Sequence, residues 1–182
     1  MSYFLSITGS PTKFSKSGFL LRSIGVILEQ RAVDFRAIHA LDLPVDEPAT
    51  RRIAAQFVAD TVEQIELAST IVIVTPANKE SSPTLLTTLL NLLPDNIFSG
   101  KPVLLFVTGG FSDHVALLER TLGDLFFRLG TKTFAARLHI GTGSWIIVGD
   151  DRPRLSRAAE REIANALDLV LQPLRPEEYS AA

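Results

Sequence analysis

Strand-length apolar runs alternate with helix-length segments along almost the whole chain, and this alternation restricts the possible folds more than any other feature. The strand-length runs are 3–8, 33–38, 70–75, 102–108 and 134–140. Segments with helical spacing of apolar residues follow each run, at 19–31, 53–67, 84–93, 114–129 and 155–171. Apolar runs without alternation are typical of strands buried on both faces of a parallel sheet. The order therefore predicts an α/β fold with three layers, a five-stranded parallel sheet carrying helices on both faces.

Length and composition favour one domain over the whole range 1–182. A chain of 182 residues is long enough to bury a substantial core without disulfides, and it contains no cysteine. The N-terminus has no basic leader, and no apolar stretch reaches the length of a membrane span. The net charge of −2 provides no basic field for nucleic acid. We expect a cytoplasmic protein that binds neither nucleic acid nor a membrane.

Three loops are the expected ligand site. In an open α/β sheet, ligands bind outside the carboxyl ends of the strands, near the point where the strand order reverses. The loops that follow the first, third and fourth predicted strands are 10–17, 76–83 and 109–114.

The first of these loops has the composition of an anion site. Its hydroxyl and ammonium donors are Ser10, Thr12, Lys13, Ser15, Lys16 and Ser17. The helix that follows adds free backbone N–H groups at its positive end. The loop has neither the ending of a P-loop nor the three spaced glycines of a dinucleotide fingerprint, which favours a terminal monophosphate. The alternative is that Ser15 or Ser17 only caps the helix and that the lysines are solvated.

Several short motifs resemble one known family. They are Thr8-Gly9-Ser10-Pro11 with Ser15 and Ser17, Thr75-Pro76 with Lys79, the leucine-rich segment 85–93 before Pro94, Gly100-Lys101, and Thr108-Gly109-Gly110 with His114. Together they resemble the NADPH-dependent FMN reductases, and within them the flavin reductases of two-component alkanesulfonate monooxygenase systems. The segment from Leu89 to Gly110 carries the most specific part of the likeness.

The resemblance implies a flavodoxin-like fold with FMN and NADPH as cofactors. It implies an enzyme that passes hydride from NADPH to FMN, the reduced flavin then serving a partner monooxygenase or another acceptor. Two alternatives stay open: a quinone or azo-type NAD(P)H reductase, and a flavodoxin-like electron carrier or scaffold without reductase activity.

The resemblance also assigns roles to residues of the three loops. The first loop would hold the FMN phosphate, with Lys13 or Lys16 supplying the charge of an Arg that the family often has at the position of Thr12. The ring system would lie along the other two loops, at Pro76, Ala77, Asn78, Lys79, Thr108, Gly109, Gly110, Ser112 and His114. Backbone N–H groups near the two glycines would face the flavin where negative charge develops on reduction.

Other chemistry is not supported by the sequence. Ser112, Asp113 and His114 are consecutive and cannot converge as a hydrolase triad. The three histidines are too scattered for a metal site. Trp145 is expected in the core or at an interface, the alternative being a cover over a ligand.

Apolar residues on two helices exceed what one sheet face needs. In 114–129 a stripe of residues at helical spacing faces the sheet, and Leu117 and Phe127 lie outside this stripe. With the leucines of 85–93 they predict a helix-to-helix homodimer or homotetramer, and the alternative is a well-buried helix pair within one chain.

Overall fold

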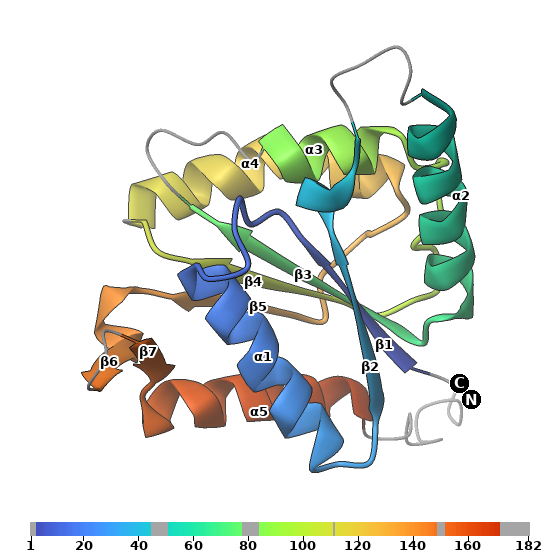
Figure 1. Cartoon of the computed structure of the whole chain (residues 1–182). Coiled ribbons are helices and arrows are strands. Elements are labelled where there is room, and N and C mark those ends of the chain that lie inside the picture. Colours follow the sequence, from blue (N-terminus) through green and yellow to red (C-terminus); the bar gives the residue numbers. More distant parts are fainter. Residues whose placement is uncertain (1–2, 45–50, 78–83, 111, 149–151, 172–182) are drawn as a thin grey trace, which may run out of the picture.

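The structure, a computed structural model, describes residues 3–44, 51–77, 84–110, 112–148 and 152–171. Strands and helices alternate along these ranges (Figure 1). In chain order they are β1 (Tyr3–Thr8), α1 (Lys16–Glu29), β2 (Asp34–His39), η1 (Ala40–Asp42), α2 (Arg51–Leu67), β3 (Thr70–Pro76), α3 (Thr84–Asn91), β4 (Val103–Thr108), α4 (Ser112–Arg128), β5 (Ala136–Ile140), η3 (Thr142–Ser144), β6 (Trp145–Val148), β7 (Arg152–Leu155) and α5 (Arg157–Leu171).

The main sheet has the flavodoxin-like strand order. Its five strands lie in the order β2-β1-β3-β4-β5, and every neighbouring pair is parallel. The order reverses beside β1, which places the switch point between β1 and β3. The predicted fold class is confirmed.

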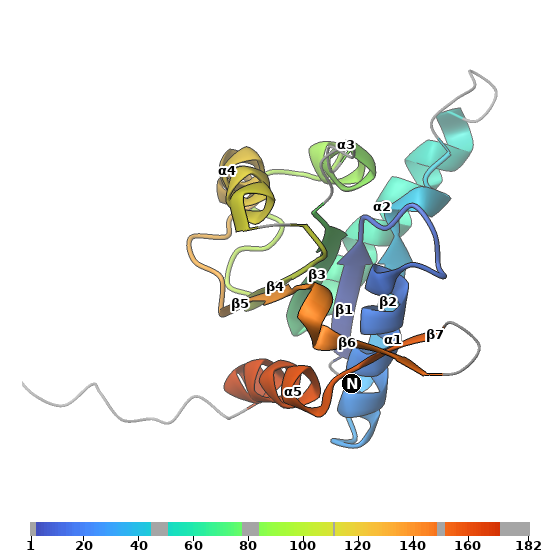
Figure 2. The same ribbon diagram turned by 90° about the vertical axis from the view of Figure 1, so that its left-hand side faces the viewer.

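Two hydrophobic cores lie on opposite faces of this sheet. One core packs α2, α3 and α4 against side chains such as Leu5, Ile73 and Leu105. The other packs α1 and α5 against alternate residues of the same strands, among them Phe4, Val72 and Phe106. Figure 2 shows the two helical layers on either side of the sheet. The period of two along each strand therefore divides its apolar side chains between two cores.

The strands differ in burial according to their place in the sheet. All residues of β1 and β4 are buried, and so are all of β3 except its last. The outer strands β2 and β5 are largely exposed or half-buried. The expectation of burial on both faces was therefore wrong for 33–38 and 134–140, because an edge strand has a neighbour on one side only.

A short antiparallel hairpin, β6 with β7, lies between β5 and α5 and was not predicted. Consequently α5 begins at Arg157 and not at Leu155, which belongs to β7. Ser156 caps the helix, since its Oγ accepts a hydrogen bond from the Ala159 N–H at 3.2 Å. The hairpin places half-buried Trp145 against the α1–α5 core, as the core interpretation of this residue predicts.

None of the helices in the described ranges has both the length and the apolar character that a membrane crossing requires.

Candidate functional site

The carboxyl ends of the five parallel strands form one edge, which brings the three expected loops together. Register pairs Thr8 with Val74, Pro76 with Thr108, and Thr108 with Ile140. The loop from Gly9 to Ser15, dark blue in Figure 1, leaves this edge and enters α1. Parallel pairing in register therefore determines which loops are neighbours.

The first loop is shaped by its own hydroxyl groups. The hydroxyls of Ser10 and Ser15 hydrogen-bond to each other and both contact the Thr12 carbonyl oxygen, at 2.8 and 2.9 Å. Thr12 Oγ1 accepts a hydrogen bond from the Phe14 N–H at 3.0 Å. Gly18 permits the close return of the chain, because a Cβ there would lie 2.2 Å from the Lys13 carbonyl oxygen. These contacts preorganise the backbone of the loop.

The start of α1 presents unused backbone donors to this loop. Ser15 is the N-cap, and its Oγ accepts the Gly18 N–H at 3.2 Å. The N–H groups of Lys13, Lys16 and Ser17 have no hydrogen-bond acceptor among the described residues. Two of these groups belong to the first helical turn, where the helix dipole favours an anion.

Ser17 lies behind the loop. Its buried Oγ is 2.6 Å from Thr108 Oγ1, so the pair links the start of α1 to the end of β4. Both residues were predicted to contact FMN; in this structure their hydroxyls contact each other.

A charged group outside the predicted set lies beside the first loop. Lys13 Nζ is 3.6 Å from Asp42 Oδ2, and both side chains are about half exposed, at 57% and 47%. Burial of the His39 ring, followed by the nearby Lys13 charge, holds the pKa of His39 below its ordinary value, although Asp42 opposes this shift. Applying the carboxyl-edge rule to the second strand as well would have identified His39 and Asp42 as neighbours of the site.

The loops after β3 and β4 touch each other. The Ala77 N–H donates to the Thr108 carbonyl at 2.9 Å. Gly109 and Gly110 have φ of 71° and 72°, and a Cβ on Gly110 would lie 2.4 Å from the Ala77 carbonyl oxygen. Only glycine accommodates both this conformation and this approach.

Hydrogen bonds on β5 support the two glycines. The Gly109 N–H donates to the Ile140 carbonyl at 3.1 Å, and the Gly109 carbonyl oxygen is 2.7 Å from His139 Nε2. For the Gly110 N–H the described residues offer no acceptor. Of the two predicted flavin donors, Gly110 alone keeps its N–H for a ligand. Sequence reasoning did not connect His139 with this loop.

The structure gathers most of the predicted site residues at one edge and leaves some outside its description. Ser10, Thr12, Lys13, Ser15, Lys16 and Ser17 are in or directly after the first loop, while Pro76, Ala77, Thr108, Gly109 and Gly110 end β3 and β4. Half-buried His114 is in the first turn of α4, and Ser112 begins that helix. Asn78, Lys79 and the side chain of Ser112 lie outside the described residues.

The residues of this site fit FMN, the cofactor that the resemblance in the sequence implies. A cluster of unbonded N–H groups with two lysines, beside a loop that a helix start preorganises, suits a phosphate monoester. The contact of Gly110 with Ala77 leaves backbone and only a small methyl side chain at the neighbouring strand ends, which suits a flat ring. Among the described residues, no group of three or more His, Cys, Asp or Glu side chains could hold a metal ion.

Comparison with known proteins gives one consistent family. The model of the NADPH-dependent FMN reductase family matches residues 3–143, which is more than three quarters of the chain. A Pseudomonas putida protein named FMN reductase (NADPH) is 31% identical over 65% of this chain and 60% of its own length. An Escherichia coli protein with the same name is 25% identical over 93% of this chain and 88% of its own length. This chain therefore spans less than two thirds of the first relative and most of the second.

Solved structures agree on the fold. An NADH:FMN oxidoreductase in its apo form superposes with a TM-score of 0.67 at 22% identity, covering 97% of this chain and 92% of its own. An FMN-dependent NADH-azoreductase from Bacillus anthracis, in complex with FMN, gives a TM-score of 0.62 at 13% identity, with coverages of 94% and 97%.

Proposed function

We propose that this chain, which belongs to the NADPH-dependent FMN reductase family, is itself an NADPH-dependent FMN reductase. The observation that carries the proposal is the anion site at the start of α1, where two lysines and three unbonded N–H groups surround a preorganised loop. When bound there, FMN supplies the redox chemistry, accepting hydride from the nicotinamide of NADPH.

The protein's own residues bind and orient. Lys13, Lys16 and the first turn of α1 hold the phosphate by charge and N–H donation. Ser10 and Ser15 keep the loop in shape. Ala77, Gly109 and Gly110 let the ring approach the backbone, and the Gly110 N–H donates toward the end that becomes negative on reduction. This division of roles needs no protein acid or base for hydride transfer.

Lys13 can leave its ion pair with Asp42 at little cost when a phosphate binds. Both members of the Lys13–Asp42 pair are about half exposed, so separating them costs about 0–1 kcal/mol. A phosphate dianion is a stronger partner than one exposed carboxylate, since it can accept charge-assisted hydrogen bonds from several donors at once. Asp42 thereby holds Lys13 beside the loop when no phosphate is bound.

The finer parts of the proposal are a cytoplasmic location, a homo-oligomer, and a flavin-dependent monooxygenase or another acceptor for the reduced flavin. NADPH is a metabolite of the cell interior, which supports the location. The apolar residues exposed on α4 support the oligomer.

The test of the proposed function is the absorption spectrum of the purified protein with added FMN, before and after anaerobic NADPH. We expect a flavin spectrum that shifts on binding and loses its visible bands within seconds of NADPH addition. A protein that leaves the spectrum of FMN unchanged would overturn the proposal, and so would bound flavin that NADPH does not bleach.

FMN titrations of two variants test whether the first loop is the phosphate site. We expect Lys13→Ala and Lys16→Ala each to weaken FMN binding about 3- to 30-fold, because each removes one charge-assisted contact to phosphate. Lys132→Ala is the matched control, since Lys132 is exposed and precedes β5 at the opposite edge of the sheet. Equal affinity in all four proteins would contradict the assignment of the first loop.

A further inference from the structure

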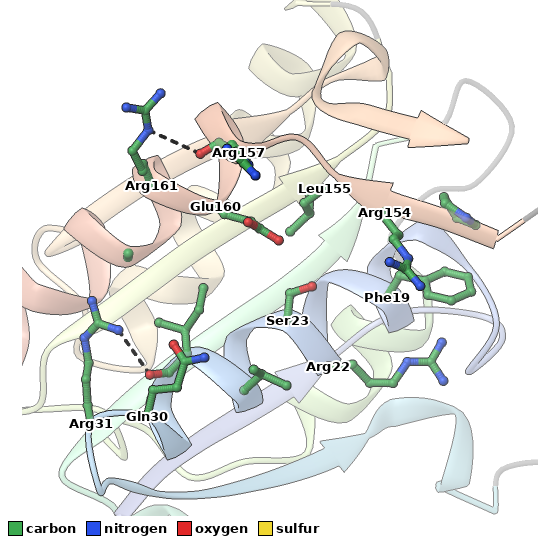
Figure 3. A pocket seen from close by; sticks show the side chains of 14 residues that line it. Phe19, Arg22, Ser23, Gln30, Arg31, Arg154, Leu155, Arg157, Glu160 and Arg161 are labelled. Atoms are coloured by element: carbon green, nitrogen blue, oxygen red, sulfur yellow. Dashed lines mark hydrogen bonds between the residues drawn. The ribbon is translucent and has the colours of Figure 1, made fainter. Parts of the chain in front are cut away.

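A long groove runs along the outer side of α1, away from the three loops. Its walls are α1 on one side and β7 with α5 on the other, and its volume is about 900 Å³. Figure 3 shows the charged side chains that line it: Arg22, Arg31, Arg154, Arg157, Glu160 and Arg161. We refer to it as the arginine groove.

The charge of the arginine groove is opposite to that of the whole chain. Five arginines and one glutamate line it, although the net charge of the protein is −2. Arg31 is held by Asp168, with Nε 2.6 Å from Oδ1. The other four arginines have no ion pair among the described residues. Two parts of the chain that are distant in sequence, α1 and the β7–α5 segment, therefore bring unneutralised positive charge to one place.

The floor of the groove is lined by apolar side chains and by Ser23. Leu155 is buried there, Phe19 and Ile27 are half-buried, and Val26 is 51% exposed. The Arg22 guanidinium lies 4.4 Å from the centre of the Phe19 ring, which fixes its position at one end. Three of the four arginines that have no described ion pair line the β7–α5 wall, and Arg22 lies on the α1 wall. Apolar side chains beside such a charged wall match an amphipathic helix, which is apolar on one side and charged on the other.

The length of the groove favours a peptide over a single phosphate group as its occupant. From Phe19 to the C-cap Gln30 the lining follows α1 over eleven steps of the chain, about 16 Å at 1.5 Å each. The free arginines are spread over both walls, with Arg157 and Arg161 one helical turn apart on α5 and Arg154 on the hairpin. A phosphate group needs its donors around one point, whereas carboxylates spaced along a helix meet donors spaced along a groove.

We propose that the arginine groove docks an acidic amphipathic helix of a partner protein, with glutamates or aspartates on the arginines and apolar residues on the floor. The groove lies on the sheet face opposite α3 and α4. A docked partner thus leaves free the face expected to mediate self-association. It also lies against α1, the helix whose first turn belongs to the proposed phosphate site.

The test is fluorescence anisotropy with a labelled, amidated 14-residue peptide that has leucines at helical spacing and six glutamates. The matched probe replaces every glutamate by glutamine. We expect the acidic peptide to bind at least tenfold more tightly than the neutral one, and at least tenfold more weakly at 500 mM than at 50 mM salt.

The matched variants are two arginine pairs. Arg157→Ala/Arg161→Ala removes two exposed groove arginines, whereas Arg51→Ala/Arg52→Ala removes two exposed arginines from α2. We expect the first pair of substitutions to weaken binding of the acidic peptide at least tenfold, and the second pair to weaken it less than twofold. Both proteins should keep the circular dichroism spectrum and FMN affinity of the parent, which shows that each is folded.

Three results would overturn the proposal. They are equal binding of the acidic and neutral peptides, equal loss of affinity in both arginine variants, and binding of inorganic tripolyphosphate at the groove without binding of the peptide. The last result would make the groove a site for small polyphosphates.

Discussion

A side chain introduced at Gly110 would disturb the proposed site in two ways. The Gly110 φ of 72° disfavours any side chain, and a Cβ would meet the Ala77 carbonyl oxygen at 2.4 Å. We expect Gly110→Ala to lower the free energy of unfolding by about 1–3 kcal/mol. It should weaken FMN binding as well, because the loops after β3 and β4 must separate. Denaturant unfolding and flavin titration measure the two effects.

The control for this prediction is Gly123→Ala on α4. A Cβ at Gly123 has no neighbour within 4 Å, and its φ is not positive. Alanine there should stabilise the helix by about 0.5–1 kcal/mol and leave FMN affinity unchanged. If the Gly110 variant proved as stable as the parent, the close contact between the two loops would be refuted.

At the scale of elements, one ion pair fastens α5 to the segment that ends α1. Arg31 donates through Nε and Nη2 to both carboxylate oxygens of Asp168, at 2.6 and 3.0 Å. This hydrogen bonding, with the attraction between the two charges, holds the pKa of Asp168 below its ordinary value of 3.8, and burial only partly opposes it. The ion pair therefore contributes its full stability above pH 3.8, the ordinary pKa of an aspartate. This contribution is lost as the pH falls through the lowered pKa of the folded state.

Asp168→Asn should consequently destabilise the protein near neutral pH by about 0.5–1 kcal/mol, a modest value because the pair is partly exposed. The difference from the parent should vanish at a pH well below 3.8, where the aspartate is protonated in both states. Urea unfolding across this range measures it, with Asp124→Asn on the exposed side of α4 as the control. A difference that does not change with pH would mean that packing, and not charge, joins the two elements.

At the scale of the whole molecule, some of the exposed apolar side chains lie on the α3–α4 side, while others, such as Phe14, lie elsewhere. Leu117 and Phe127 on α4 are 64% and 72% exposed, and Leu92 after α3 is 51% exposed. Four side chains of the stripe predicted to face the sheet are buried, namely Leu118, Leu122, Phe126 and Leu129. The sequence prediction of an inner stripe with apolar residues outside it is confirmed, whereas the oligomer stays a prediction.

The oligomer prediction is tested by light scattering after size exclusion at micromolar concentration. The parent should elute at a multiple of 19.9 kDa, and Leu117→Glu/Phe127→Glu should shift it to the monomer. Glutamate at these exposed positions leaves the core intact, so the fold should be retained. A parent protein that scatters as a monomer would disprove the oligomer.

The sequence alone predicted the strands of the main sheet, the helices beside them and the sheet edge at which the proposed site lies, but not the β6–β7 hairpin. Continuous apolar runs with helical segments between them have few stable arrangements, and parallel strands place their carboxyl ends at one edge. The first loop could be proposed as an anion site because hydroxyls, lysines and a helix start are adjacent in sequence. The family motifs then supplied FMN as the expected ligand.

Only the tertiary structure decided how individual groups are used. Ser17 and Thr108 are 91 positions apart, and their hydroxyls pair because α1 packs beside β4. Packing of distant segments also explains three other features. They are the exposure of β2 and β5, the contact of Gly110 with Ala77, and the ion pair of Lys13 with Asp42. The arginine groove has the same origin, since its arginines are scattered over α1, β7 and α5 until these elements pack. Local pattern determines which element a residue joins, and long-range packing determines which group it meets.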